Sequence, residues 1–288
     1  MLNAEVIIKT RCELGEGPLW DEREQCFYWV DILPGKIHRY DPAGGDHQVY
    51  DVGEMIGTIG LRENGGLVVA VRSGFAYFDI STETLTPITD PEADKPDNRF
   101  NDGKPSPDGG FFAGTMAVSG AEGAGALYYL SQAGDVKKVV DNVSISNGIA
   151  WSIDLKTMYY IDSTPKKVYA FDYDASNGEV SNQRLCIQVA EELGSPDGMC
   201  IDTEGKLWIA HFGGGCVRRW DPETGAILET VSVPTQKVTC AVFGGANMDT
   251  LYITTAAMGT DAINDPLAGC LFSVKLPFKG LPAYRYQA

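Results

Sequence analysis

A weak repeat runs through the whole 288-residue sequence and constrains the fold more than any other feature. Each unit opens with a short segment that carries a glycine or another small residue, passes through a polar turn into a β-rich run, and ends in Asp/Asn/Pro/Gly turn chemistry typical of a hairpin. The marker residues of the six units lie 40 to 50 residues apart. They are Gly17, Gly57, Gly103, Gly148, Gly198 and Cys240.

Repeats of this length, each with four short strands, are typical of the blades of a β-propeller. The helical segments that a parallel α/β fold needs between its strands are missing from the pattern. The sequence therefore predicts an all-β fold, a six-bladed β-propeller with four-stranded antiparallel blades, as a single domain over residues 1–288. The first strand, EVIIKT (5–10), is expected to complete the last blade and close the ring, which removes exposed sheet edges.

Composition narrows the choice of partner and compartment. A net charge of −16 disfavours nucleic acid and anionic membranes as partners, because both attract basic surfaces. Seven cysteines without a C-x-x-C pair fit neither a disulfide framework nor a zinc knuckle, so reduced thiols are expected. With no signal peptide or long apolar run, we expect a cytoplasmic protein whose oligomeric state the sequence leaves open.

The repeat also predicts which residues meet in space. Residues just before the innermost strands of a propeller surround one mouth of its channel, and loops over a rigid scaffold are a usual place for a site. The positions before the markers are Glu16, Ile56, Asp102, Asn147, Asp197 and Thr239. An Asp-Gly or Asn-Gly pair taken alone predicts only a turn. Carboxylates and amides that converge on one axis, however, need a cation or donors between them, and an all-oxygen set suits hard divalent ions.

Several motifs together make the chain similar to a known family. They are LGEGPLW (14–20), RFNDGK (99–104), FAGTM (112–116), SNGIAWS (146–152), PDGMCID (196–202) and WDPETG (220–225). In this order they resemble the SMP-30/gluconolactonase/regucalcin-like family, from about residue 12 to the C-terminus. The resemblance implies a six-bladed propeller that hydrolyses sugar lactones with one divalent metal ion in its channel.

The resemblance also implies roles for individual residues. The implied metal ligands are Glu16, Asn147 and Asp197. Arg99 and Asn101 are implied to contact the substrate. Asp102 is implied to stabilise the loop that carries them without binding the metal ion itself. Asp197 is implied to act as general base as well, the alternative being that the ion itself activates the water.

The expected cofactor is one divalent ion, namely Ca²⁺, Mg²⁺, Mn²⁺ or Zn²⁺, with iron as a further candidate. The expected reaction is hydrolysis of an aldonolactone, such as glucono-, xylono-, arabinono- or galactonolactone, to the aldonic acid. One alternative is a non-catalytic calcium- or ligand-binding propeller, which Arg99 disfavours because a cation beside a metal is costly for pure ion binding. Another is hydrolysis of non-sugar esters.

One segment departs from the animal members of the family. Acidic residues follow FAGTM in those members, whereas Val118 and Ser119 stand here and Glu122 lies beyond them. The glycine-rich stretch GAEGAGAL (120–127) is expected to form a flexible lid. The three histidines, His38, His47 and His211, are too few and too dispersed to predict a catalytic triad.

Overall fold

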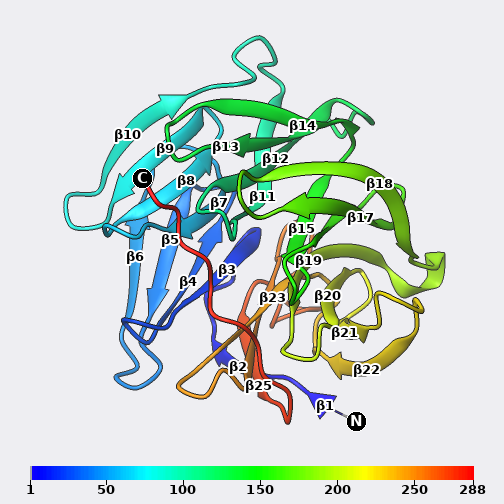
Figure 1. Cartoon of the computed structure of the whole chain (residues 1–288). Coiled ribbons are helices and arrows are strands. Elements are labelled where there is room, and N and C mark those ends of the chain that lie inside the picture. Colours follow the sequence, from blue (N-terminus) through cyan, green and yellow to red (C-terminus); the bar gives the residue numbers. More distant parts are fainter. Residues whose placement is uncertain (1) are drawn as a thin grey trace.

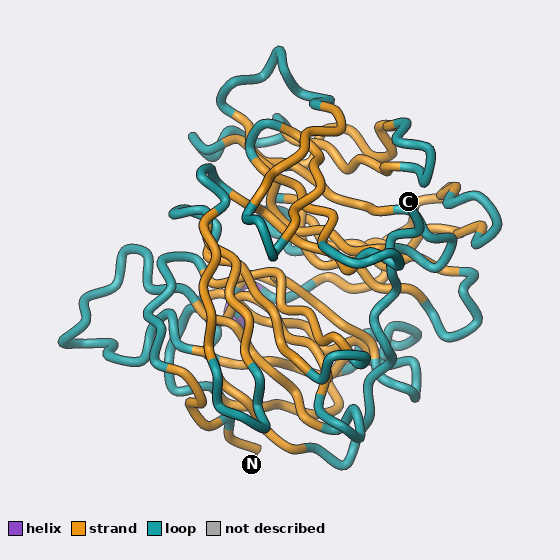
Figure 2. Tube along the Cα trace, turned by 90° about the vertical axis from the view of Figure 1, so that its left-hand side faces the viewer, coloured by secondary structure: helices purple, strands orange, loops and turns teal. Residues whose placement is uncertain are grey.

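The computed structural model describes residues 2–288, and strands dominate this range (Figure 1; Figure 2). They form six sheets arranged around a central axis, so the predicted six-bladed β-propeller with four-stranded antiparallel blades is confirmed. The helical structure in the described range is a single 3-10 turn, η1 (Glu191–Leu193). We number the blades 1 to 6 along the chain.

The first three blades each use four consecutive strands, with the first strand innermost. Blade 1 contains β3 (Gly15–Asp21), β4 (Cys26–Asp31), β5 (Lys36–Tyr40) and β6 (His47–Asp51). Blade 2 contains β7 (Ile56–Leu61), β8 (Leu67–Val71), β9 (Gly74–Asp79) and β10 (Thr84–Thr89). Blade 3 contains β11 (Asn98–Pro105), β12 (Phe111–Ala117), β13 (Gly125–Leu130) and β14 (Val136–Val143).

The last three blades follow the same plan. Blade 4 contains β15 (Ser146–Trp151), β16 (Thr157–Asp162), β17 (Lys167–Asp174) and β18 (Glu179–Gln188). Blade 5 contains β19 (Ser195–Ile201), β20 (Leu207–Phe212), β21 (Cys216–Trp220) and β22 (Ile227–Ser232). Blade 6 contains β23 (Val238–Gly244), β24 (Thr250–Thr255) and β25 (Leu271–Lys275).

The N-terminal segment supplies the missing outer strand of blade 6. Strand β2 (Glu5–Ile8) pairs antiparallel with β25, as expected for the segment EVIIKT. The preceding β1 (Leu2–Asn3) pairs parallel with β22 at the edge of blade 5, which the sequence did not predict. The N-terminal segment therefore joins two neighbouring blades.

The apolar core is divided into six layers, because each hydrophobic cluster lies between the facing sheets of two neighbouring blades. Between blades 2 and 3, for example, the rings of Phe75 and Phe100 lie 4.7 Å apart. Innermost strands such as β3, β7 and β15 are buried along their whole length, since neighbours cover both faces. Outer strands such as β18 are mostly exposed and polar.

After β25 the chain crosses one face of the ring as an extended segment, the C-terminal strap (residues 276–288; red in Figure 1). Arg285 Nη2 lies 2.5 Å from Asp21 Oδ1 of blade 1, and the Tyr286 hydroxyl donates to the Ser131 carbonyl in the turn between β13 and β14 of blade 3. The strap covers the end of the channel where the innermost strands finish, leaving a cavity of about 70 Å³ lined in part by Lys104 and Tyr284. The residues just before the innermost strands, where the sequence predicts a site, therefore lie at the opposite mouth of the channel.

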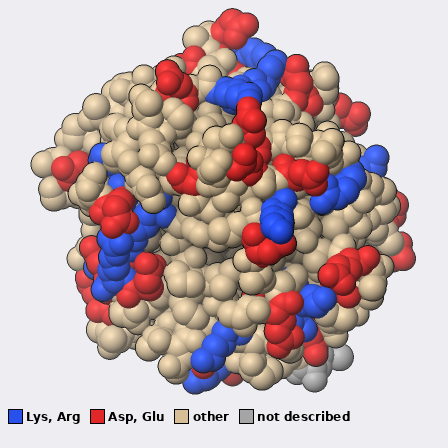
Figure 3. All heavy atoms as spheres, in the orientation of Figure 1, with Lys and Arg blue, Asp and Glu red and all other residues tan. Residues whose placement is uncertain are grey.

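On the face shown in Figure 3, Lys and Arg side chains lie next to Asp and Glu side chains, and no continuous basic area forms on that face. No helix within residues 2–288 has the length and apolar character needed to span a membrane. All seven cysteines are free, as expected.

Candidate metal centre

A β-bulge interrupts the innermost strand of every blade at the marker position. The pairing register shifts between Glu16 and Leu19, Ile56 and Thr58, Phe100 and Gly103, Ser146 and Ile149, Pro196 and Met199, and Val238 and Cys240. A bulge inserts an extra residue and re-aims the local side chain. The interpretation of these Asp-Gly and Asn-Gly pairs as turns was wrong, because the pairs lie inside strands.

The structure brings the three expected ligands to one cavity of about 690 Å³. Glu16, Asn147 and Asp197 come from β3, β15 and β19, and each is less than 9% exposed. Arg99 and Asn101 of β11 line the same cavity. The other repeat positions are used in packing: Ile56 lies in the core layer between blades 1 and 2, and the Thr239 hydroxyl donates to the Gly15 carbonyl.

The amide of Asn147 has an orientation fixed by its neighbours. Ser163 Oγ donates its single proton to the Pro196 carbonyl (2.6 Å), so it can only accept a hydrogen bond from Asn147 Nδ2 (2.9 Å). This leaves Asn147 Oδ1 beside the cavity without a partner among residues 2–288. A buried acceptor without a donor costs about 1–3 kcal/mol. A cation bound at this oxygen would offset that cost, so the residue fits a metal ligand.

Buried acidic groups surround the same point. Burial and the nearby Asp197 and Asp102 raise the pKa of Glu16 well above its usual value. Burial, followed by the charge of Asp102, raises the pKa of Asp197 in the same way, against hydrogen bonds with Asn147 and Glu16. A divalent ion between the carboxylates would relieve this repulsion. With its two carboxylates and one amide oxygen, the set matches hard divalent ions.

Arg99 supplies a positive charge to the cavity wall. Burial lowers its pKa to about 10, while the charges of Glu16 and Asp197 oppose the shift, so the guanidinium stays charged at neutral pH. Its Nη1 donates to the Phe100 carbonyl (2.9 Å) and to Asn101 Oδ1 (2.8 Å). Asn101 Nδ2 in turn donates to the Ser146 carbonyl (2.7 Å). The remaining N–H groups of Arg99 are available to a ligand, and Asn101 holds the arginine in place.

Asp102 does not line this cavity. It is buried within β11, where its Oδ1 accepts a hydrogen bond from Gly103 N (2.7 Å). The expected loop around Asp102 is therefore a strand. Burial raises its pKa, and the charge of Lys104 opposes the shift. Asp102 acts on the site through its charge, which contributes to the raised pKa of both Glu16 and Asp197.

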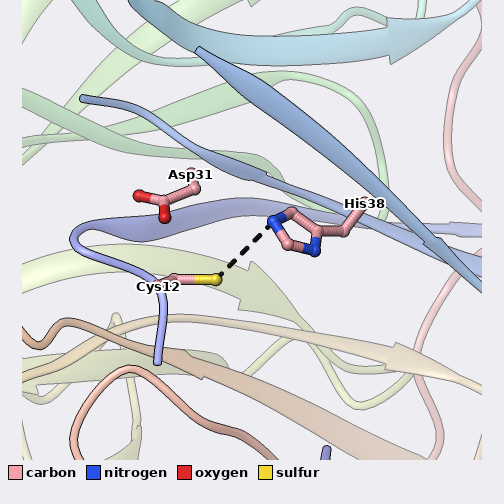
Figure 4. A group of neighbouring side chains, drawn as sticks. All are labelled: Cys12, Asp31 and His38. Carbon is pink, nitrogen blue, oxygen red and sulfur yellow. Dashed lines mark hydrogen bonds between the residues drawn. The ribbon is translucent and has the colours of Figure 1, made fainter. Parts of the chain in front are cut away.

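A second group of side chains with metal-ligand chemistry lies in blade 1 (Figure 4). The ligand atoms of Cys12, Asp31 and His38 lie within 4.8 Å of one another. The sequence did not predict this group, and its histidines were considered only for a catalytic triad. In the structure His38 Nδ1 is 3.0 Å from His47 Nε2. Burial raises the pKa of the Cys12 thiol to about 11 and lowers that of His38 to about 4, so both are neutral near pH 7.

The buried position of Asp31 is explained by hydrogen bonds that stabilise the fold. Its carboxylate accepts hydrogen bonds from the backbone N–H groups of Glu13 and Leu14, which lead into the innermost strand of blade 1. Asp162 in blade 4 accepts the same pair of bonds, from Ser144 and Ile145. A repeated structural role explains its position without a metal. The unpaired oxygen of Asn147 has no such explanation, so we assign the candidate metal centre to the channel mouth.

Comparison with known proteins supports the fold and the family resemblance. Residues 14–257 match the family model described as the SMP-30/Gluconolactonase/LRE-like region. Regucalcin from Danio rerio is 41% identical over 291 residues, covering 99% of this chain and 98% of that protein. A solved luciferin-regenerating enzyme has a TM-score of 0.94 at 34% identity, over 99% of each chain.

A second solved structure, described as a calcium-binding protein, regucalcin, comes from Agrobacterium tumefaciens. It is 29% identical to this chain, with a TM-score of 0.95 over 100% of this chain and 99% of that one. The family match spans all the strands that carry the candidate ligands. The order of its motifs, its fold and its 41% identity to regucalcin over nearly the full length show that this chain belongs to the SMP-30/gluconolactonase/LRE-like family.

Proposed function

We propose that this protein is a metal-dependent lactonase, which opens a cyclic ester to a hydroxy acid with one divalent ion held by Glu16, Asn147 and Asp197. The observation that carries the proposal is the unpaired Asn147 Oδ1 next to two buried carboxylates and the charged Arg99. Aldonolactones are the first substrates to test, because the family resemblance implies sugar lactones as substrates.

The chemistry follows from these residues. A divalent ion bound there would polarise the ester carbonyl and lower the pKa of water. Asp197 accepts the proton of the attacking water at a carboxylate oxygen, as the water oxygen bonds to the carbonyl carbon. When the ring C–O bond breaks, that proton passes to the ring oxygen, and the product is a hydroxy acid. Arg99, held by Asn101, donates N–H groups to oxygens of the ester that gain negative charge.

The test is a proton-release assay over a panel of five- and six-membered aldonolactones, with protein that has been stripped by a chelator and reloaded with each candidate ion. We expect stripping to remove activity and reloading to restore it. Asp197→Asn, matched with the exposed Asp154→Asn, should lower kcat by about 10²–10⁴-fold, the usual contribution of a general base. Unchanged rates in loaded Asp197→Asn protein would overturn the role of Asp197.

A second candidate function is calcium binding without catalysis. It is favoured by the all-oxygen ligand set and by the similarity to a structure described as a calcium-binding protein. Stoichiometric Ca²⁺ binding with no turnover of any lactone would select this candidate. Arg99 speaks against it, because a cation next to the ion weakens ion binding but helps to bind the oxygens of an ester.

A further inference from the structure

The candidate site has an outer part with a different chemistry from its polar floor. Six partly or largely exposed apolar side chains line the cavity around the polar groups, and we call them the apolar wall. They are Leu33, Met116, Val118, Ile145, Phe212 and Met258. They come from blades 1, 3, 4, 5 and 6, so the wall surrounds the mouth rather than forming one side of it.

Backbone hydrogen bonds fix the positions of four members of the apolar wall before any ligand binds. Met116 and Ile145 pair through a β-bridge between blades 3 and 4, and Phe212 pairs with Lys237 between blades 5 and 6. The backbone N–H of Val118 donates to the Asp97 carbonyl (2.8 Å). Side chains positioned in this way can bury an apolar group without a large loss of conformational entropy.

Two hydroxyl groups at or near the wall are already used within the protein, whereas those of Thr164 and Ser195 also line the cavity. Ser119 Oγ donates to the Asp97 carboxylate (2.5 Å), and Ser163 Oγ is used between Asn147 and Pro196. Glu122, in the glycine-rich stretch that was expected to form a lid, does not line the cavity. A substrate hydroxyl buried against the apolar wall would lose its water without gaining a partner.

From these observations we infer that the preferred substrate is a lactone with an apolar alkyl or aryl group on its ring, and that the apolar wall binds this group. The inference rests on the proposed lactonase function and names the substrate class of the same site. The ester oxygens face the metal ligands and Arg99 on the floor, and the hydrocarbon lies against Val118, Phe212 and their neighbours. A cavity of about 690 Å³ lined this way is typical of sites for largely apolar small molecules.

Two substrates with the same six-membered ring test the inference by activity. We expect the metal-loaded protein to hydrolyse δ-decalactone, which carries a pentyl group, with a kcat/KM at least tenfold higher than glucono-δ-lactone, after correction for spontaneous hydrolysis. Burial of a few methylene groups is sufficient for a tenfold effect. A preference for glucono-δ-lactone that depends on Asp197 would overturn the inference and leave the proposed function intact.

A binding experiment separates the apolar wall from catalysis. The probes are 6-pentylpiperidin-2-one, a lactam that resists hydrolysis, and unsubstituted piperidin-2-one, both measured by calorimetry. We expect the pentyl lactam to bind at least tenfold more tightly, and Val118→Asp to lower its affinity at least tenfold. Val49→Asp is the matched control, because Val49 on β6 is 50% exposed and Val118 is 49% exposed. It should leave the affinity unchanged.

The outcomes of the binding experiment are distinct. Equal affinity for the two lactams, or no effect of Val118→Asp in a folded protein, overturns the inference. Tight, Val118-dependent binding of the pentyl lactam without turnover of any lactone supports the apolar wall as a binding surface and overturns the proposed lactonase function instead.

Discussion

At the scale of single residues, the orientation of one amide decides the chemistry of the channel mouth. Ser163 and Pro196 hold Asn147 so that its oxygen is left for a ligand. We predict that Asn147→Ala lowers the affinity for a divalent ion by about 10–100-fold, the range seen when a metal site loses a supporting group. Calorimetric titration with Ca²⁺ and Mn²⁺ measures this. The exposed Asn64→Ala should bind as the wild type does, and equal affinities in both variants would remove Asn147 from the site.

His211 is a single residue that makes the stability of the fold depend on pH. It is fully buried on β20 and accepts a hydrogen bond from Trp220 Nε1 (3.2 Å), and burial lowers its pKa from 6.5 to about 3. The unfolded chain therefore binds more protons than the folded chain in this interval. The stabilisation is fully present above pH 6.5 and is lost as the pH falls towards 3.

We predict that the buried histidines make the free energy of unfolding in urea fall as the pH is lowered from 6.5 to 5, by at most about 1.4 kcal/mol per pH unit for each, while the raised pKa values of Glu16 and Asp197 contribute in the opposite direction. His211→Gln should make this slope shallower. It should not abolish the slope, because burial also lowers the pKa of His38 to about 4. An unchanged slope in His211→Gln would show that other groups cause the pH dependence.

At the scale of elements, the marker glycines Gly57, Gly148 and Gly198 let neighbouring innermost strands approach closely around the axis. A Cβ atom on Gly57 of β7 would lie 2.5 Å from the backbone of Phe100 and Asn101 on β11. We predict that Gly57→Ala lowers the free energy of unfolding by about 1–3 kcal/mol, the usual cost of overpacking. Urea denaturation checks this against Gly44→Ala, where the nearest atoms belong to the movable Asp41 side chain. Equal stabilities would mean that β7 can shift away from β11 at little cost.

At the scale of the whole molecule, the core is a closed ring of six layers, and each blade contributes to two of them. The N-terminal strand β2 and the C-terminal strap tie the two ends of the chain into this ring. We therefore expect residues 1–288 to behave as a single domain, with one cooperative unfolding transition. Tryptophan fluorescence and far-UV circular dichroism should report the same urea midpoint. Separate midpoints would indicate that blades unfold independently.

Much of this architecture could be predicted from the sequence, because a blade is a local unit. Its turns, its short strands and its period of 40 to 50 residues all depend on residues that are close together in the sequence. The same period placed Glu16, Asn147 and Asp197 at equivalent points of three blades, and the family motifs suggested their roles. A local sequence pattern was misleading where it fits two structures. An isolated Asn-Gly pair predicts a turn, but Asn147-Gly148 lies in a bulge of β15.

The sequence by itself thus determined the number of blades, the closing strand and the residues to examine. Only the tertiary structure decided how those residues act together, because the decisive contacts join segments far apart in the chain. The free oxygen of Asn147 depends on Ser163 and on Pro196 of the next blade, and the apolar wall draws on five blades. Such contacts depend on how the blades pack around the axis, which no local sequence pattern encodes.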